Sequence, residues 1–251
     1  MSGVILSVQN DFVRTARTLK DKKGRMQQRA FLVEGVKCVS ELLAHKPALL
    51  RTLIVTEDAG EEWAARANSL GRRAVTVAPH VMAAICDTKT PQAVAAVAAL
   101  PEPAEISRGF IVAMDDVQDP ANVGTIIRTA DAAGCGSVVL SEGSADPYAP
   151  KAVRASMGSL FHLPVLRTQL KPYLIKLQEA GYQIACADLD GQTDFTLDAE
   201  KTCLVIGNES RGISREILTL SDVRVRIPIY GKAESLNAAV AAGILIYKIR
   251  S

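Results

Sequence analysis

Short apolar runs alternate with segments of helical period along the first hundred residues. The expected strands lie at 30–35, 49–56, 72–78 and 93–100, and the expected helices lie at 36–45, 61–70 and 80–87. Short strands separated by helix-length segments are typical of a layered α/β domain. Trp63 falls on the 61–70 helix, where a core position is favoured over a platform for stacking RNA bases. The stretch 101–109 has two prolines and no periodicity, which predicts a linker.

A second α/β series follows the linker. Its expected strands lie at 110–117, 137–143, 163–167, 182–189, 202–206 and 223–229, and its expected helices at 120–134, 149–158, 171–181, 214–220 and 235–250. The strands are continuous runs of Val, Ile and Leu without strict alternation, which indicates a parallel sheet covered on both faces. Ligands of such sheets bind beyond the carboxyl ends of the strands, so polar residues that directly follow strands are candidate site residues.

Composition excludes several classes of protein. Apolar residues make up 48% of the 251 residues, which is ample for a buried core. No apolar run is long enough to cross a bilayer, and residues 1–14 lack the pattern of a secretory signal, so we expect a cytoplasmic protein. The five cysteines lack C-x-x-C spacing and the three histidines are far apart in sequence, so neither a disulfide nor a metal site is expected.

The net charge of +2 hides one basic stripe. Between residues 14 and 29, a single acid, Asp21, stands against seven basic residues: Arg14, Arg17, Lys20, Lys22, Lys23, Arg25 and Arg29. Such a stripe can neutralise phosphates and release counterions, which suits a nucleic-acid partner. A solvated helix face without a ligand is an equally frequent explanation.

The first candidate motif follows the strand at 110–117. Pro120 is suited to the first turn of a helix, Asn122 lies near its start, and Gly124 permits close approach of another backbone. Arg128 stands in an apolar stretch of the same helix. Taken alone, Arg128 is explained more readily as a structural arginine paired with a carboxylate.

Two further motifs lie near the C-terminus. Gly207 and Gly212 bracket Asn208 and Glu209 in a tight turn after a strand, which suits a loop whose backbone contacts a ligand but is also common as a plain connection. This loop lacks the G-x-G-x-x-G and Walker patterns, which disfavours a dinucleotide or triphosphate site. The third motif, at 223–250, predicts Ser235 as the N-cap of a helix rich in small residues, and a capped core helix gives no reason for Asn237.

Together, the motifs resemble the signature of the SpoU (TrmH-like) family of ribose 2′-O-methyltransferases, in the SPOUT superfamily. The matching features are N-x-G-x-x-x-R at Asn122, Gly124 and Arg128, G-x-E-x-x-G at Gly207, Glu209 and Gly212, and I-P then S-L-N at Ile227, Pro228 and 235–237. The first half resembles the L30e-like RNA-binding domain that often precedes such a domain. The resemblance covers nearly the whole chain.

The resemblance implies an α/β protein with two domains. Residues 1–103 would form an L30e-like domain that binds the RNA substrate, and residues 104–251 a parallel-sheet SPOUT methyltransferase domain with a trefoil knot. Homodimers through the C-terminal domain are typical of the family and imply a shared active site. Pattern alone would have excluded a knot.

The resemblance also implies an S-adenosylmethionine-dependent enzyme and its site residues. Gly207, Ile227, Leu236 and Ala187 are expected to hold the cofactor, and the expected catalytic residues are Arg128, Asn122, Glu209, Ser235 and Asn237. Deprotonating a guanidinium at neutral pH costs roughly 7 kcal/mol, because its ordinary pKa lies far above 7. Our hypothesis is therefore that Arg128 stays cationic and stabilises developing alkoxide charge, while Glu209 orients Arg128 or takes the proton through water.

The sequence says less about which RNA is the substrate than about the reaction. Lys37 stands where many relatives have His, and Ala93 where a Gly is frequent. The expected RNA contacts are Arg14, Arg17, Lys22, Lys23, Arg25, Arg29, Lys37, Lys151 and Arg154, and for the last two solvated surface charge is an equal alternative. Ribosomal RNA is favoured over tRNA by analogy with ribosomal enzymes that carry an L30e-like domain. The rival functions are a non-catalytic RNA-binding or ribosome-assembly factor, a tRNA 2′-O-methyltransferase and a base methyltransferase on a related fold.

Overall fold

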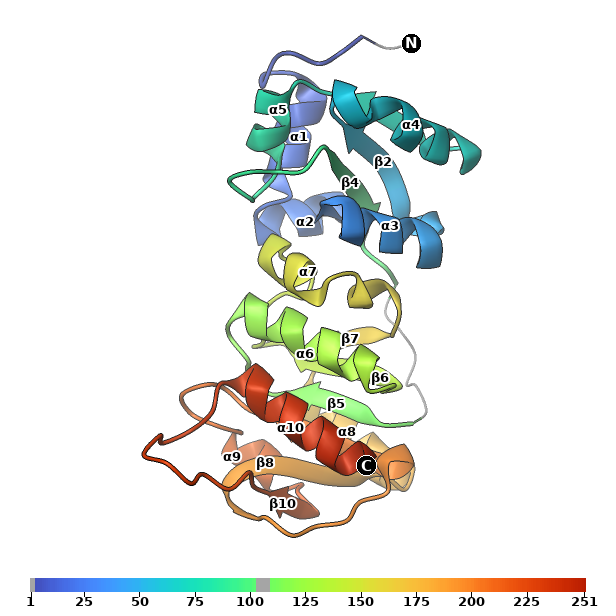
Figure 1. Ribbon diagram of the computed structural model, residues 1–251. Helices are drawn as coiled ribbons and strands as arrows, with labels where there is room; N and C mark the ends of the chain where they lie inside the picture. Colours follow the sequence, from blue (N-terminus) through green and yellow to red (C-terminus); the bar gives the residue numbers. More distant parts are fainter. Residues whose placement is uncertain (1–2, 103–108) are drawn as a thin grey trace. The chain divides into compact units, whose positions relative to one another are not determined.

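The computed structural model describes residues 3–102 and 109–251 (Figure 1). Its contacts divide the chain into two compact units, residues 1–102 with 148–161 (unit 1) and residues 103–147 with 162–251 (unit 2). Residues 103–108 of the expected linker lie outside the described residues, and the division of function at 103/104 stays a prediction. Among the described residues, no helix has the length and apolar character needed to cross a membrane.

Unit 1 is a layered α/β unit, as expected. Its elements are α1 (Asp11–Thr18), α2 (Lys22–Gln28), β1 (Ala30–Glu34), α3 (Val36–His45), β2 (Leu50–Val55), α4 (Gly60–Ser69), β3 (Arg73–Thr76), α5 (Pro79–Ile85), β4 (Val94–Ala99) and α7 (Pro150–Ser156). The strands form one sheet in the order β1-β4-β2-β3. β4 is antiparallel to both of its neighbours, and β2 and β3 are parallel.

The core of unit 1 follows from its apolar pattern. All five residues of β1 are buried. Val13, Ala16 and Leu19 recur at a spacing of three and face the same core from α1. Trp63 is 6% exposed, which confirms its predicted core position. The ring of Phe31 lies 5.0 Å from that of Tyr148, and this contact ties residues 148–161 to β1.

Unit 2 contains the predicted parallel sheet. Its elements are β5 (Ile111–Met114), α6 (Pro120–Ala132), β6 (Ser137–Ser141), β7 (Val165–Thr168), α8 (Leu170–Glu179), β8 (Gln183–Gln192), β9 (Thr202–Ile206), α9 (Arg215–Leu218), β10 (Val223–Val225) and α10 (Ala238–Arg250). The strand order is β10-β8-β9-β5-β6-β7, and every neighbouring pair is parallel. Short 3₁₀ turns occupy Pro47–Leu49, Glu57–Ala59, Ser159–Phe161 and Ala199–Lys201.

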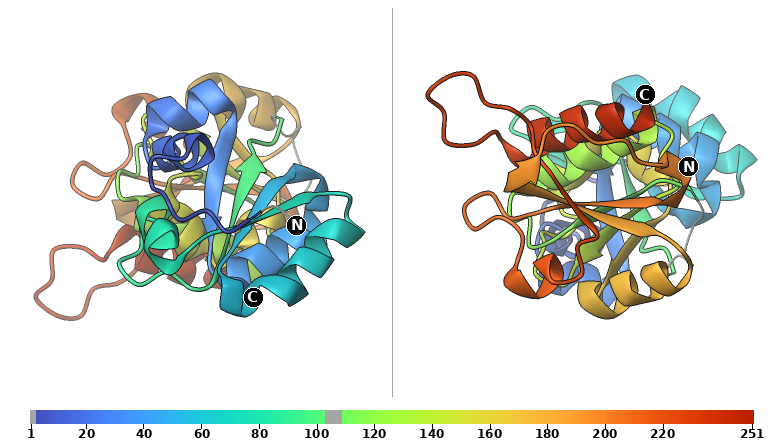
Figure 2. Two further views of the ribbon diagram at one scale, coloured as in Figure 1. Left: turned by 90° about the horizontal axis from the view of Figure 1, so that it is seen from above. Right: turned by 90° about the horizontal axis from the view of Figure 1, so that it is seen from below.

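Helices cover both faces of this sheet. α8 and α9 pack on one face through a shared apolar core, and α6 and α10 lie together on the other (Figure 2). At Gly243 on α10, a Cβ would lie 3.7 Å from the Thr129 methyl group, which is an ordinary van der Waals contact, so the packing of the two helices does not require a glycine there. The loop after β8 reaches the exposed side of α10, where Lys248 donates to the carbonyl of Thr193 and lies 4.3 Å from the Phe195 ring. α10 therefore has contacts with α6 on one side and with this loop on another.

The parallel register brings the first two motifs together. Met114, at the end of β5, pairs with Ile206, at the end of β9, so the segments that follow both strands emerge at the same edge. The expected strand at 223–229 ends at Val225. Residues 226–229 leave the sheet at the edge where ligands of such folds bind. The five cysteines are buried free thiols.

Candidate active site

Three side chains from the three motifs form one hydrogen-bonded chain at this edge. Asn122, only 8% exposed on α6, donates from Nδ2 to Oε1 of Glu209 at 2.8 Å. Its Oδ1 accepts from Nδ2 of Asn237 at 3.0 Å. Because the carboxylate can only accept and the Asn237 oxygen is already used by α10, the orientation of both amides is fixed by their partners. The structure thus brings together three of the five expected catalytic residues.

The Glu209 carboxylate is held by the start of α6. Its Oε2 accepts from the backbone N–H of Gln118 at 3.1 Å, and its Oε1 accepts from that of Asp119 at 3.3 Å. Burial alone would raise the pKa of Glu209, but the hydrogen bonds from Asn122 and from backbone N–H groups outweigh it and lower the pKa below the ordinary value. Glu209 is therefore ionised at neutral pH and binds the 207–212 loop to α6.

Asn237 has a structural role that the sequence did not reveal. Its Oδ1 accepts from the N–H groups of Ala239 at 2.9 Å and Val240 at 3.3 Å, so Asn237 is the N-cap of α10. The prediction that Ser235 caps this helix is wrong. Ser and Asn are comparably good N-caps, and the chain between them does not begin its helical path until Ala238. Ser235 is exposed and lines a cavity instead.

The loop between the two glycines is closed on itself. Asn208 and Gly212 form an isolated bridge, and a Cβ on Gly207 would lie 2.3 Å from the backbone carbon of Gly212, which excludes any larger residue at position 207. Asn208 also donates from Nδ2 to the carbonyl of Asp116 at 2.8 Å. Asp116 was not among the expected site residues, because the strand expected at 110–117 placed it inside the sheet, whereas β5 ends at Met114. Asp116 has a left-handed backbone and pairs with Arg211.

An apolar cavity lies beside this cluster, at the ends of β8 and β10. Three of the four expected cofactor residues, Ala187, Ile227 and Leu236, line it together with Ser235. Gly207 is not among the lining residues. The remaining lining residues are Asp188, Leu189, Val225, Arg226, Ile229, Ala241 and Leu245.

The lining of the cavity suits the adenine part of S-adenosylmethionine. Its apolar walls suit a planar ring, and residues 227–236 make no hydrogen bond to any described part of the chain. The backbone N–H and C=O groups of this segment are therefore available to the polar edges of a ligand. That these backbone groups hold the cofactor stays a prediction.

Arg128 lies apart from the cluster. It is six residues beyond Asn122 on α6. At 3.6 residues per turn, the two side chains point in directions about 120° apart around the helix axis. Its side chain is exposed, and within the described ranges it has no hydrogen bond or ion pair. The expected contact between Glu209 and Arg128 does not form within one chain, because Asn122 and two backbone N–H groups occupy the carboxylate.

The basic residues of unit 1 divide into two groups. Arg14, Arg17, Lys22 and Lys23 are exposed, and Arg14 and Arg17 line shallow grooves along α1. Arg25, in contrast, is 3% exposed and donates to the carbonyls of Leu19 and Lys20, so it holds the turn between α1 and α2. The sequence could not separate these groups because the turn at 19–21 interrupts the helical period.

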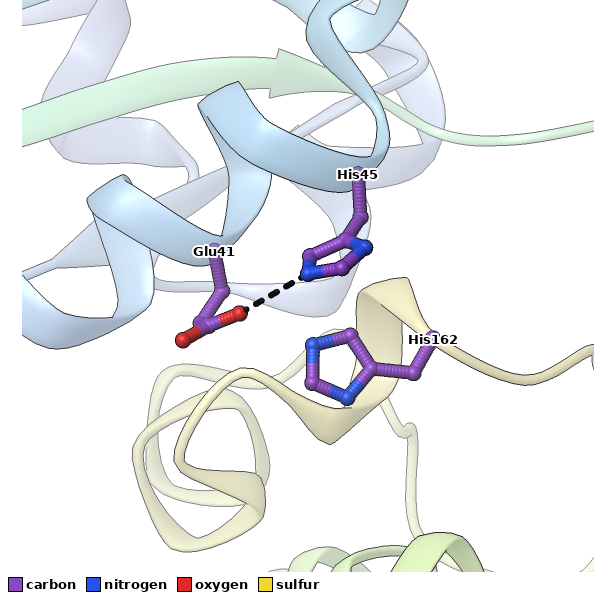
Figure 3. A group of neighbouring side chains, drawn as sticks. All are labelled: Glu41, His45 and His162. Atoms are coloured by element: carbon purple, nitrogen blue, oxygen red, sulfur yellow. Dashed lines mark ion pairs between the residues drawn. The ribbon is translucent and has the colours of Figure 1, made fainter.

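The other expected RNA contacts are mostly neutralised. Lys37 pairs with Glu41, which also lies 3.2 Å from His45 on the next turn of α3 (Figure 3). Arg154 lies 2.7 Å from Asp87 and 3.4 Å from the buried carboxylate of Glu34. Of the two remaining residues, Arg29 pairs with Glu102 and Lys151 is exposed. Paired cations attract phosphates less strongly than unpaired ones.

Comparison with known proteins identifies the family. The sequence matches the SpoU rRNA Methylase family over residues 109–247 and the MRM3-like substrate binding domain over residues 10–96. The chain belongs to the SpoU rRNA methylase family. Among SpoU relatives, the 23S rRNA (guanosine(2553)-2'-O)-methyltransferase RlmP of Bacillus subtilis is 36% identical over 248 residues, which cover 98% of each chain.

Solved SpoU structures agree with the fold along the whole chain. The AdoMet-bound rRNA methyltransferase from Sinorhizobium meliloti has a TM-score of 0.87 at 33% identity, covering 98% of this chain and 96% of that chain. The SpoU methyltransferase AviRb from Streptomyces viridochromogenes, in complex with AdoMet, has a TM-score of 0.84 at 32% identity, covering 96% and 97%. The expected SpoU fold, preceded by a separate α/β domain, is confirmed.

Proposed function

We propose that the protein transfers a methyl group from S-adenosylmethionine to a ribose 2′-hydroxyl of structured RNA, and that the RNA is ribosomal. The observation that carries the proposal is the hydrogen-bonded chain of Asn122, Glu209 and Asn237 beside the apolar cavity, in a chain of the SpoU family. RlmP is named for a guanosine of 23S rRNA, and a relative from Streptomyces viridochromogenes is named for a uridine. These names support rRNA over tRNA and leave the acceptor base open. An rRNA substrate also accords with a cytoplasmic location.

The cluster fixes the geometry of the reaction. When bound, S-adenosylmethionine supplies an electrophilic methyl group on a sulfonium. Glu209 clamps the 207–212 loop to α6, and Asn237 fixes the start of α10 next to Leu236 in the cavity wall. A carboxylate with a lowered pKa is a weak base, so Glu209 positions these segments, and the proton that the 2′-hydroxyl loses as its oxygen bonds to the methyl carbon passes to solvent water. Ser235, exposed at the cavity, is available to the substrate.

Arg128 completes the site from a second copy of the chain. The exposed face of α10 presents Val240, Ile244 and Tyr247, which recur at spacings of four and three residues and form an apolar stripe. Arg128 is exposed on α6, the helix that packs against α10. A homodimer through this face would bury the stripe and carry Arg128 to the partner's cavity. The shared active site then explains why Arg128 has no partner among the described residues of its own chain.

Arg128 acts as a cation in this proposal. Its guanidinium holds a phosphate of the target nucleotide and stabilises the charge that develops on the 2′-oxygen. Arg128→Ala is expected to abolish turnover, and Arg128→Lys to retain little, because lysine lacks the planar fork of donors. Near-normal turnover of Arg128→Lys with a new pH dependence would instead favour a role as base.

The decisive experiment uses rRNA transcribed in vitro from the genes of the source organism, which carries no methyl groups. The protein is incubated with this RNA and labelled S-adenosylmethionine, and the digested nucleosides are separated by mass spectrometry. We expect one 2′-O-methylated nucleoside. A methylated base would identify a base methyltransferase, and cofactor binding without transfer to rRNA but with transfer to tRNA would move the substrate to tRNA. Absence of cofactor binding in calorimetry would identify a non-catalytic RNA-binding relative.

A further inference from the structure

The most exposed aromatic ring of the described chain lies in the loop that forms the cavity wall. Tyr230 is 94% exposed, although tyrosine is usually at least half buried in folded proteins. The residues on both sides of it in sequence, Ile229 on one side and Ser235 and Leu236 on the other, line the cavity. Tyr230 thus follows a cavity residue directly in sequence, without itself lining the cavity or contributing to any core.

The loop that carries Tyr230 is built without internal support. Residues 228–237 are all exposed, and 227–236 have no hydrogen bond within the described ranges. Figures 1 and 2 show this loop projecting from unit 2 between β10 and α10. Its two ends are anchored, by Arg226 N–H to the carbonyl of Gln192 and by the Asn237 cap. An exposed ring on an anchored arm is available to a partner that approaches the cavity.

We propose that Tyr230 stacks on the base of the acceptor nucleotide, an inference that rests on the proposed function. The 2′-hydroxyl must reach the cavity, and the base of the same nucleotide is joined to that ribose by one glycosidic bond. The reaction leaves the base untouched, so its flat face is free to be held. Aromatic side chains hold unstacked RNA bases in this way.

The charges near Tyr230 also suit an RNA nucleotide. Arg226 lines the cavity and Lys232 lies two residues beyond the ring. The acids nearby are Glu234 in the loop and Asp188 in the cavity wall, and Asp188 pairs with Arg224. Arg226 and Lys232 can accompany the phosphates that flank the base. Because every base has a π-face, the stack would add affinity for an unstacked nucleotide without choosing its identity.

The test compares three substitutions of an exposed residue, which should leave folding intact. Tyr230→Leu keeps apolar bulk without a flat ring, whereas Tyr230→Phe and Tyr230→Trp keep the ring. We expect Tyr230→Leu to raise KM for the in vitro rRNA about 5- to 100-fold, the range spanned by loss of one base–aromatic stack. The KM values of Tyr230→Phe and Tyr230→Trp should stay near that of the wild-type protein. The Kd for S-adenosylmethionine, measured by calorimetry, should be the same for all four proteins.

A fluorescence measurement gives an independent readout. Trp63, the natural tryptophan, is buried, so the new indole in Tyr230→Trp reports on its own surroundings. Adding the rRNA should quench it, and the buried Trp63 of the wild-type protein should change little. Absence of quenching, with binding shown by a mobility shift, would contradict the stack.

Other outcomes separate this inference from the proposed function. If the wild-type protein methylates the rRNA and Tyr230→Leu has an unchanged KM, the stack is wrong and the function stands. If Tyr230→Leu is a monomer where the wild type is a dimer, Tyr230 belongs to the contact between subunits and the inference is overturned. If the wild-type protein transfers no methyl group to RNA, the proposed function itself fails.

Discussion

The amide of Asn122 is buried and uses both of its polar atoms on residues from other motifs. A buried polar side chain is costly unless its hydrogen bonds are made, so this amide constrains Glu209 and Asn237 at once. The sequence singled out all three residues, but only through resemblance to a family. Their contacts span 87 and 115 positions along the chain, and no local pattern reports such distances.

Glu209→Gln tests the carboxylate clamp. A glutamine cannot accept at both of its terminal atoms, so the hydrogen bond from Gln118 or Asp119 is lost. Because the site is exposed to solvent, we expect the free energy of unfolding at neutral pH to fall by only about 1 kcal/mol. Denaturation in urea measures this difference.

The pH dependence of that difference has a definite sign. The pKa of Glu209 is lowered in the folded protein, so its ionised form stabilises folding above the ordinary value of 4.5. As the pH falls below that value and through the lowered pKa, this contribution disappears. The difference in free energy of unfolding between the wild-type and Glu209→Gln proteins should then fall to zero. A difference that stays constant down to about pH 3 would show that the charge of Glu209 is not involved.

At the scale of elements, the start of α10 joins stability to activity. Asn237→Ala removes the N-cap and should lower the free energy of unfolding by about 1 kcal/mol. Ser235→Ala, two residues earlier, should leave stability unchanged. Asn237→Ser keeps a capping oxygen but cannot donate to Asn122 in the same way, so it should recover the stability that the cap supplies, keep the cost of the unpaired Asn122 oxygen, and lose turnover. Equal destabilisation by Ser235→Ala and Asn237→Ala would contradict the assignment of the cap.

Elements were largely predictable from the sequence, and their ends were not. The apolar strands of unit 2 and the amphipathic helices appear close to their expected ranges. Residues 226–229 read as a continuation of β10, because Ile227 and Ile229 are as apolar as a strand residue, yet they line a cavity. The choice between Ser235 and Asn237 as N-cap was also undecidable locally, because both residue types satisfy the same backbone donors.

The basic face of α1 and α2 is the element that we expect to hold RNA. Replacing exposed Arg14 and Arg17 with Ala should weaken rRNA binding at every salt concentration and reduce the slope of log Kd against log salt by about 1 to 2. Lys176→Ala, which removes an exposed lysine from α8, is the matched control and should change neither. Binding is measured by filter retention across a salt series. An unchanged slope would show that Arg14 and Arg17 belong to a solvated helix face without an RNA ligand.

For the whole molecule, the apolar stripe on α10 predicts the oligomeric state. Ile244, 43% exposed on that stripe, and Ile175, 37% exposed on α8, are matched in type and exposure. Ile244→Asp places a charge in the proposed subunit contact and should give a monomer without turnover. Ile175→Asp should remain dimeric and active. Light scattering after size-exclusion chromatography measures the oligomeric state of both variants. A dimeric Ile244→Asp protein would show that the exposed face of α10 is not the subunit contact.

The position of Arg128 makes a sharper prediction about the dimer. If Arg128 serves the cavity of its partner, then a chain with Arg128→Ala still offers an intact cavity, and a chain with Ala187→Phe, whose cavity is filled, still offers an intact Arg128. A mixed dimer of the two inactive chains therefore contains one complete site and one site with both defects. The two homodimers contain no complete site.

Co-expression of the two chains in equal amounts gives about half mixed dimers, and therefore about a quarter of the wild-type activity. If Arg128 acted on the cavity of its own chain, every site in the mixture would carry one defect and activity would stay absent. Different affinity tags on the two chains isolate the mixed dimer, and calorimetry with S-adenosylmethionine should find one binding site per mixed dimer in either case. Restored turnover at that single site would place the guanidinium in the partner's cavity, which one chain alone cannot reveal.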